Sequence, residues 1–171
     1  MTDITEPQTE TIAKEHKKLC LMLYGVFALS LILQFINLAT ILLGSAAILA
    51  GVILAYVERK KAQGTIYGNH LQYLIRTFWI GGAVYLPVAT VLGTILLTRF
   101  MDMTPLQEAN STGEATVEAA TQALLAANRA LIVKVMIAVT APFAVWWFWR
   151  CGYGYKRLSE NKKIPNPMSW L

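Results

Sequence analysis

The sequence predicts an all-α polytopic membrane protein with four transmembrane helices and an extramembrane helical extension before the fourth. Hydrophobic residues make up 56% of the 171 residues and charged residues only 15%, whereas soluble domains carry about 25% charged residues. No charged residue occurs between Leu19 and Tyr56, a third apolar run covers 77–97, and a fourth, interrupted by Lys134, covers most of the expected span 131–150. We expect these runs to fold as a single membrane domain over 1–171.

The charge-free run follows a polar segment, 1–18, and is long enough for two spans. As one helix it would measure about 57 Å, which exceeds the ~30 Å thickness of the hydrocarbon core. We therefore expect a helical hairpin over 19–56 that turns at its most polar point, Gln34–Asn37. The sequence leaves open whether both helices cross fully or form a re-entrant hairpin.

Basic residues predict the orientation, because Lys and Arg concentrate on the cytoplasmic side of membrane proteins. They cluster in 1–18, in the connection 57–76 and in the tail 151–171, whereas the segment 98–130 carries four acidic residues. Both termini are therefore expected in the cytoplasm and 98–130 outside. The same bias, with attraction to anionic lipid, accounts for the net charge of +5, so no nucleic-acid partner is expected.

The connection 57–76 holds the residues most able to carry chemistry. Asn69 is expected to cap a short amphipathic helix that leads into the third span, because apolar residues recur after it at helical spacing. Arg76 is expected to pair with Glu58 or with a lipid phosphate. The candidate structural or functional collar consists of Glu58, His70, Arg76 and Trp79.

Two prolines lie inside the apolar runs, Pro87 in the third and Pro142 in the fourth. Each removes a backbone donor and is expected to bend its helix. The bends either give shape alone or frame a central cavity, as broken helices do in transporters.

Small residues four apart, such as Ala46 and Ala50, either pack the bundle internally or form a docking surface. An Ala-rich stretch from Glu114 to Arg129 predicts a helix that runs continuously into the fourth span. The aromatic run 146–149, beside Arg150, is typical of an interfacial belt.

The connection and tail resemble small uncharacterised bacterial inner-membrane proteins with four spans. The shared elements are Gly64-Thr65, His70, Arg76-Thr77-Phe78-Trp79, Ile164-Pro165-Asn166-Pro167 and Trp170-Leu171. These proteins are distantly similar to Tic-type proteins, which are related to chloroplast inner-envelope translocon components. The resemblance implies a multi-pass protein of the bacterial inner membrane with both termini cytoplasmic. We further expect the proline-rich tail to fold back near His70.

The sequence contains no signature of catalysis, since HExxH, P-loop and nucleophile-elbow motifs are all missing. We expect no catalytic, cofactor-binding or metal-binding residues, and no cofactor. The predicted function is a non-catalytic accessory, scaffold or assembly subunit of a membrane complex. Its partners would be the lipid bilayer and either other inner-membrane proteins or a second copy. The alternatives are a small channel or carrier around Pro87 and Pro142 and, less favoured, a membrane enzyme.

Overall fold

The computed structural model describes residues 6–112 and 116–169, and this part of the chain is helical, with no strand. The all-α prediction is therefore confirmed. Four segments are long and apolar enough to cross a membrane: Thr11–Leu33, Leu38–Lys61, Ile66–Phe100 and Arg129–Ser159. These segments correspond to the four predicted spans.

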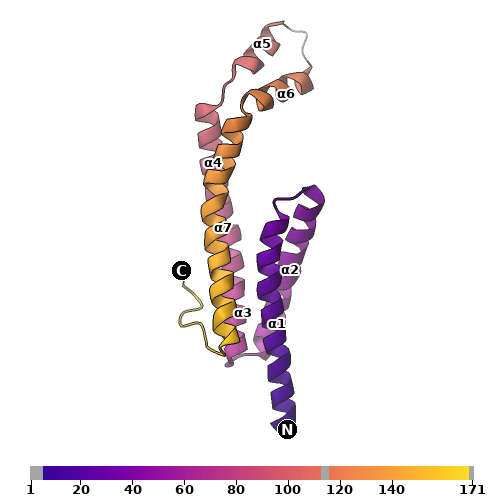
Figure 1. Cartoon of the computed structure of the whole chain (residues 1–171), viewed down its shortest axis with the longest axis vertical. Helices are drawn as coiled ribbons and strands as arrows, with labels where there is room; N and C mark the ends of the chain where they lie inside the picture. Colours follow the sequence, from indigo (N-terminus) through magenta and orange to yellow (C-terminus); the bar gives the residue numbers. More distant parts are fainter. Residues whose placement is uncertain (1–5, 113–115, 170–171) are drawn as a thin grey trace. The chain divides into compact units, whose positions relative to one another are not determined.

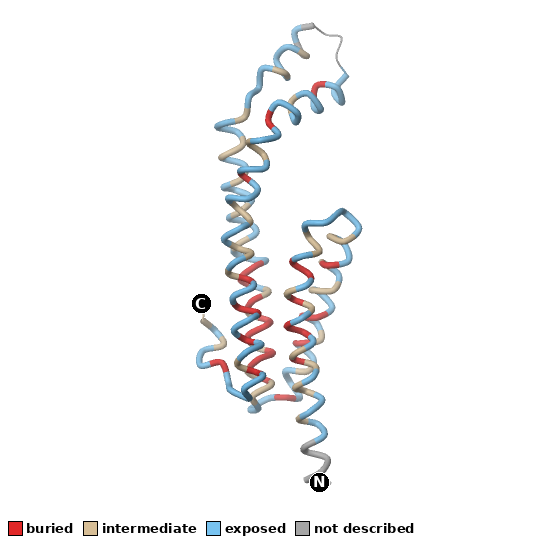
Figure 2. The backbone as a smooth tube through the Cα atoms, viewed as in Figure 1, coloured by how far each residue is buried: buried red, intermediate tan, exposed pale blue. Residues whose placement is uncertain are grey.

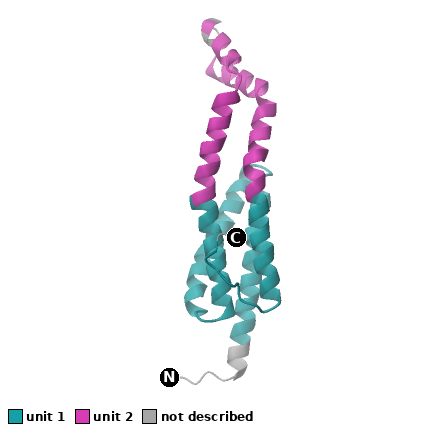
Figure 3. Ribbon diagram, turned by 90° about the vertical axis from the view of Figure 1, so that its left-hand side faces the viewer, with its two compact units in different colours: residues 1–83, 144–171 teal, residues 84–143 magenta. Residues whose placement is uncertain are grey.

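Contacts divide the chain into two compact units (Figure 3). Unit 1 comprises residues 1–83 and 144–171, and unit 2 comprises residues 84–143. Most buried side chains belong to unit 1 (Figure 2). The first complete helix of unit 2, α4 (Leu86–Phe100), has no buried residue.

The predicted hairpin is formed by α1 (Glu6–Leu33) and α2 (Leu38–Lys61), which lie side by side in unit 1 (Figure 1). Its turn falls where the sequence predicts it. Asn37 ends the turn as the N-cap of α2: its side chain accepts from the Thr40 backbone N–H at 3.0 Å, and the Thr40 hydroxyl accepts from the Asn37 N–H at 3.0 Å. This capping box satisfies two backbone donors at the start of α2.

Two glycines of α2 allow it to approach α1 closely. A Cβ atom at Gly44 would lie 2.9 Å from the Ser30 carbonyl oxygen, and one at Gly51 would lie 3.3 Å from the Phe27 ring. The internal contact therefore uses two glycines seven residues apart, which is two helical turns. Ala46 and Ala50 are exposed instead.

A tight turn joins α2 to α3 (Ile66–Trp79). Gly64 has a φ of 82°, a conformation that favours glycine, and Thr65 follows as the N-cap. The Thr65 hydroxyl accepts from the Gly68 N–H at 3.2 Å and donates to the Ala62 carbonyl at 2.7 Å. The prediction of Asn69 as the N-cap is wrong, because a hydroxyl four residues earlier already caps the helix.

The third span continues from α3 through a π-helical segment, η1 (Ile80–Tyr85), into α4. Pro87 lies in the first turn of α4. Because proline has no N–H, the carbonyl one turn before it cannot receive the usual helical hydrogen bond. The distortion predicted at Pro87 thus takes the form of wider π winding immediately before it.

Unit 2 contains α5 (Thr104–Thr112) and α6 (Val117–Ala127) between α4 and α7 (Arg129–Ser159). Residues 113–115, where the Ala-rich helix was predicted to begin, lie outside the described residues. The prediction that this helix runs into the fourth span is wrong. Asn128 interrupts it, because its side-chain amide binds Asp102: Nδ2 donates to the Asp102 carbonyl at 2.9 Å, and Oδ1 accepts from the Asp102 N–H at 2.7 Å.

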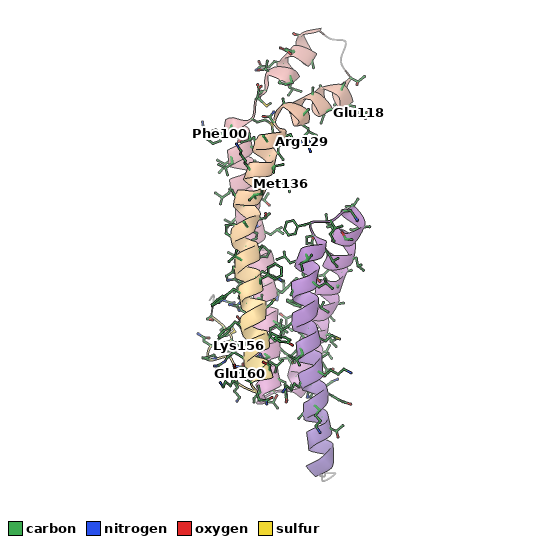
Figure 4. The ribbon with its side chains drawn as sticks, viewed as in Figure 1. Phe100, Glu118, Arg129, Met136, Lys156 and Glu160 are labelled. Carbon is green, nitrogen blue, oxygen red and sulfur yellow. The ribbon has the colours of Figure 1, made fainter. Side chains whose placement is uncertain are left out.

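Within unit 2, α4 and α7 run side by side (Figure 1), and Phe100 and Arg129 lie at the same end of the pair (Figure 4). Tyr85, the last residue of η1, connects the start of α4 to α7: its hydroxyl donates to the Val139 carbonyl, and its ring stacks on Phe143 with centroids 4.0 Å apart. Pro142 lies inside α7 and is exposed.

The helix α7 continues past residue 150, where the predicted span ended, to Ser159. Asn161 then adopts a φ of 54°, and the Lys162 N–H donates to the Arg157 carbonyl at 2.8 Å. This left-handed residue and backward hydrogen bond form a helix C-cap of Schellman type. They reverse the chain, so that the tail returns toward α3.

Candidate functional site

The most polar part of the unit 1 core surrounds His70, whose side chain is fully buried. The Tyr24 hydroxyl of α1 lies 2.9 Å from His70 Nδ1, and the Lys162 carbonyl oxygen lies 3.0 Å from Nε2. A carbonyl can only accept, so Nε2 carries a proton, and in the neutral ring Nδ1 accepts from the tyrosine hydroxyl. The neutral ring thus joins α1, α3 and the tail, and both its nitrogens are occupied.

Asn69 holds the next part of the tail. Its Nδ2 donates to the Ile164 carbonyl at 3.1 Å, and its Oδ1 accepts from the Ile164 N–H at 2.7 Å. Ile164 is 3% exposed. The expectation that the tail folds back near His70 is therefore confirmed for the described residues, whereas Trp170 and Leu171 lie outside them.

Arg150 is a second buried polar residue of unit 1, with no exposed surface. Its Nε donates to the Thr77 hydroxyl at 3.0 Å, and Nη1 donates to the Ser169 carbonyl at 3.0 Å. Its guanidinium lies 4.1 Å from the centroid of the Tyr73 ring, within cation–π distance. Nη2 is buried and has no hydrogen-bond partner in the described part of the chain.

The aromatic run beside Arg150 is divided between core and surface. Trp147 is 4% exposed; its ring stacks on Phe27, and its Nε1 donates to the Phe27 carbonyl at 2.9 Å. Trp149 is 67% exposed. The interfacial-belt prediction is therefore wrong for Trp147, because helical periodicity turns it toward α1.

The four predicted collar residues do not form one cluster. His70 lies in the polar core, as described above. Glu58 has other partners: its carboxylate contacts Lys61 at 2.7 Å and His16 at 3.6 Å. Arg76 is not among the residues that the Glu58 carboxylate contacts, and its alternative pairing with a lipid phosphate stays a prediction. Arg76 lies in the last turn of α3 and is half-buried.

Trp79, the last member of the predicted collar, is on the surface. Its Nε1 donates to the Tyr56 hydroxyl at 2.8 Å, which links the end of α3 to α2. Both rings are exposed. This exposed pair has the features of an interfacial aromatic anchor, as does the exposed Trp149 of the run at 146–149.

Sequence reasoning missed Tyr24, Tyr73 and Arg150 as members of the polar core. Arg150 ends an apolar run, a position that is also typical of a residue at the membrane surface. The two tyrosines lie among apolar residues, and no local spacing marks them as partners of residues on distant helices. Asn69, His70 and Tyr73 belong to the stretch 57–76 that the sequence singles out, whereas Tyr24 lies outside it.

Among the described residues, no group of three or more His, Cys, Asp or Glu side chains could hold a metal ion. The buried side chains of His70 and Arg150 instead form hydrogen bonds and, for Arg150, a cation–π contact. This arrangement suits the attachment of the tail to the helices.

Comparison of the chain with protein-family models, curated proteins and solved structures found no match.

Proposed function

We propose that this protein is a non-catalytic accessory, scaffold or assembly subunit of a bacterial inner-membrane complex. The observation that carries the proposal is the apolar surface of α5 and α6, which lie between the third and fourth candidate spans. Val117 is 84% exposed and Leu125 51%. In α6 Ala120 is the buried residue.

These two helices are too short to be stable alone. They contain 9 and 11 residues, and isolated helices below about 12–15 residues are marginal in water. Lipid covers the apolar residues of the spans, but α5 and α6 lie outside the spans. A protein partner that covers Val117 and Leu125 would stabilise α5 and α6 and bury their apolar surface.

The polar core supports a structural role rather than catalysis. Both His70 nitrogens are occupied, and Arg150 contacts Thr77, Ser169 and Tyr73 within the chain. A catalytic group needs access to a substrate. These side chains are instead occupied in joining helices to the tail.

The proposed orientation places both termini in the cytoplasm and α5 and α6 outside. Three basic residues end α2, and two occur in the last turn of α7, as expected of cytoplasmic ends. A membrane-impermeant maleimide should label Gln122→Cys in intact spheroplasts, and Lys163→Cys only after permeabilisation. The native Cys20 and Cys151 are buried, and the unsubstituted protein provides the background. Equal labelling at both positions before permeabilisation would contradict this orientation.

The assembly role is tested by native mass measurement after extraction in a mild detergent. We expect a defined complex that Val117→Asp and Leu125→Lys dissociate. Asp near a helix N-terminus and Lys near a C-terminus are compatible with the helix dipole, so both variants preserve α6. Gln122→Lys, at an exposed polar position of α6, is the matched control. A monomer in the unsubstituted protein, or equal loss of the complex in all three variants, would contradict the proposal.

The channel or carrier alternative depends on space between α4 and α7 near Pro87 and Pro142. The stacked rings of Tyr85 and Phe143 occupy that region, and both prolines are exposed. These contacts favour the assembly role. Solute flux through reconstituted liposomes that increases in Tyr85→Ala would instead support a pathway along α4 and α7.

A further inference from the structure

A hollow of about 590 Å³ lies in unit 1, where three segments distant in sequence meet. These segments are the end of α2, the start of α3 and the tail. The hollow adjoins the polar core at Asn69, which lines it, but neither His70 nor Arg150 does. The tail supplies part of its wall, and Asn69 helps to hold the tail against α3.

The walls of this hollow are positively charged. Three cations line it, and none of its lining residues is acidic. The lining cations are Arg59, Lys60 and Lys163. All three are exposed, and none forms an ion pair with a described carboxylate. Glu58 and Glu160 contact Lys61 and Lys162 instead.

An aromatic pair places the hollow at the depth of the lipid headgroups. Tyr56 lines it, and the Tyr56 hydroxyl accepts from Trp79 Nε1. These rings are 41% and 50% exposed. Exposed Tyr and Trp are enriched where the membrane meets water. The cations of the hollow therefore lie beside the layer that contains lipid phosphates.

We propose that this hollow binds the phosphate-bearing headgroup of an anionic phospholipid. The three cations contact the phosphate, and Tyr56 lies against the glycerol region. A bound lipid also contacts Lys163 of the tail, so it strengthens the attachment of the tail to α3. This inference concerns the cytoplasmic end of unit 1 and is independent of the partner proposed for α5 and α6.

Native mass spectrometry of the full chain in mild detergent tests the proposal. The protein is titrated with phosphatidylglycerol or with phosphatidylcholine, which has no net charge. We expect phosphatidylglycerol to bind more tightly. Replacing the three cations, in R59Q/K60Q/K163Q, should weaken its binding at least about tenfold, because each basic residue near an anionic lipid surface contributes to affinity.

The matched control is K14Q/K18Q/K156Q, which removes the same charge at exposed positions that do not line the hollow. This control should bind phosphatidylglycerol as the unsubstituted protein does. Lys163→Gln alone changes only the tail and leaves every helix intact. It should weaken binding by about threefold to fivefold, so a folding defect in the triple variant cannot obscure the result.

Three outcomes would overturn the proposal. Equal loss of binding in both triple variants would assign the effect to overall charge. Equal affinity for the two lipids would exclude headgroup charge as the basis of recognition. Displacement of phosphatidylglycerol by inorganic phosphate would assign the hollow to a small soluble anion instead of a lipid.

Discussion

The side-chain amide of Asn69 binds both backbone polar groups of Ile164, at 2.7 Å and 3.1 Å. Asn128 binds the N–H and carbonyl of Asp102 in the same way. An asparagine amide carries both a donor and an acceptor, so it can replace a backbone partner completely. In each unit, one asparagine side chain therefore binds a non-helical segment, whose backbone groups lack the regular hydrogen bonds of a helix.

Asn69→Ala should release the tail. It removes two hydrogen bonds from the partly buried backbone of Ile164, which should cost about 1–3 kcal/mol. Limited digestion with trypsin should cleave faster after Lys162 and Lys163. Gln63→Ala is the control, because the Gln63 side chain is exposed and has no hydrogen bond among the described residues. An unchanged cleavage rate in Asn69→Ala would show that other contacts hold the tail.

Two glycines on α7 should respond oppositely to alanine. A Cβ atom at Gly154 would overlap the Tyr24 ring, whereas one at Gly152 meets nothing within 4 Å. Gly154→Ala should displace Tyr24 from His70 and lower the thermal unfolding temperature. Gly152→Ala should raise it slightly, because alanine favours a helix interior by up to about 1 kcal/mol. The same direction of change in both variants would contradict the packing of Tyr24 against α7.

Arg150→Lys should destabilise the protein although it preserves the charge. Lysine lacks the planar fork that reaches Thr77 and Ser169 together and stacks on Tyr73. We expect a loss of about 2 kcal/mol in the free energy of unfolding, measured by denaturation in detergent. Arg59→Lys, the same change at an exposed position, should stay within about 0.5 kcal/mol. Equal stability of the two variants would contradict a structural role for the guanidinium.

Asn128→Ala should loosen unit 2 locally. It removes both hydrogen bonds to Asp102 and the third that Asn128 Nδ2 donates to the Leu124 carbonyl at 2.9 Å. Amide hydrogen exchange should accelerate at Asp102 and in α6, while the amides of α1 and α3 keep their protection. Gln122→Ala, at an exposed position of α6, is the control. Unchanged exchange at Asp102 would show that Asn128 does not hold this segment.

Local sequence was a sound guide to the spans and their turn, because hydrophobic length and the polarity at Gln34–Asn37 act within a few residues of the features they predict. It was a poor guide to capping and pairing. Asn69 and Thr65 are both good caps in isolation; the chain uses Thr65, and the Asn69 side chain binds Ile164 instead. Glu58 and Arg76 both belong to the connection 57–76, yet the carboxylate contacts Lys61, three residues away, and His16 on α1.

The sequence by itself determined that the chain is helical, that four segments can cross a membrane and where basic residues gather. These properties follow from the cost of exposing apolar side chains to water and backbone polar groups to lipid, which each segment meets on its own. Tertiary structure decided that the side chains of Tyr24, Arg150 and Asn69 form hydrogen bonds within the molecule. A buried polar side chain must find a partner, and in this protein those partners lie on helices and a tail far away in the chain.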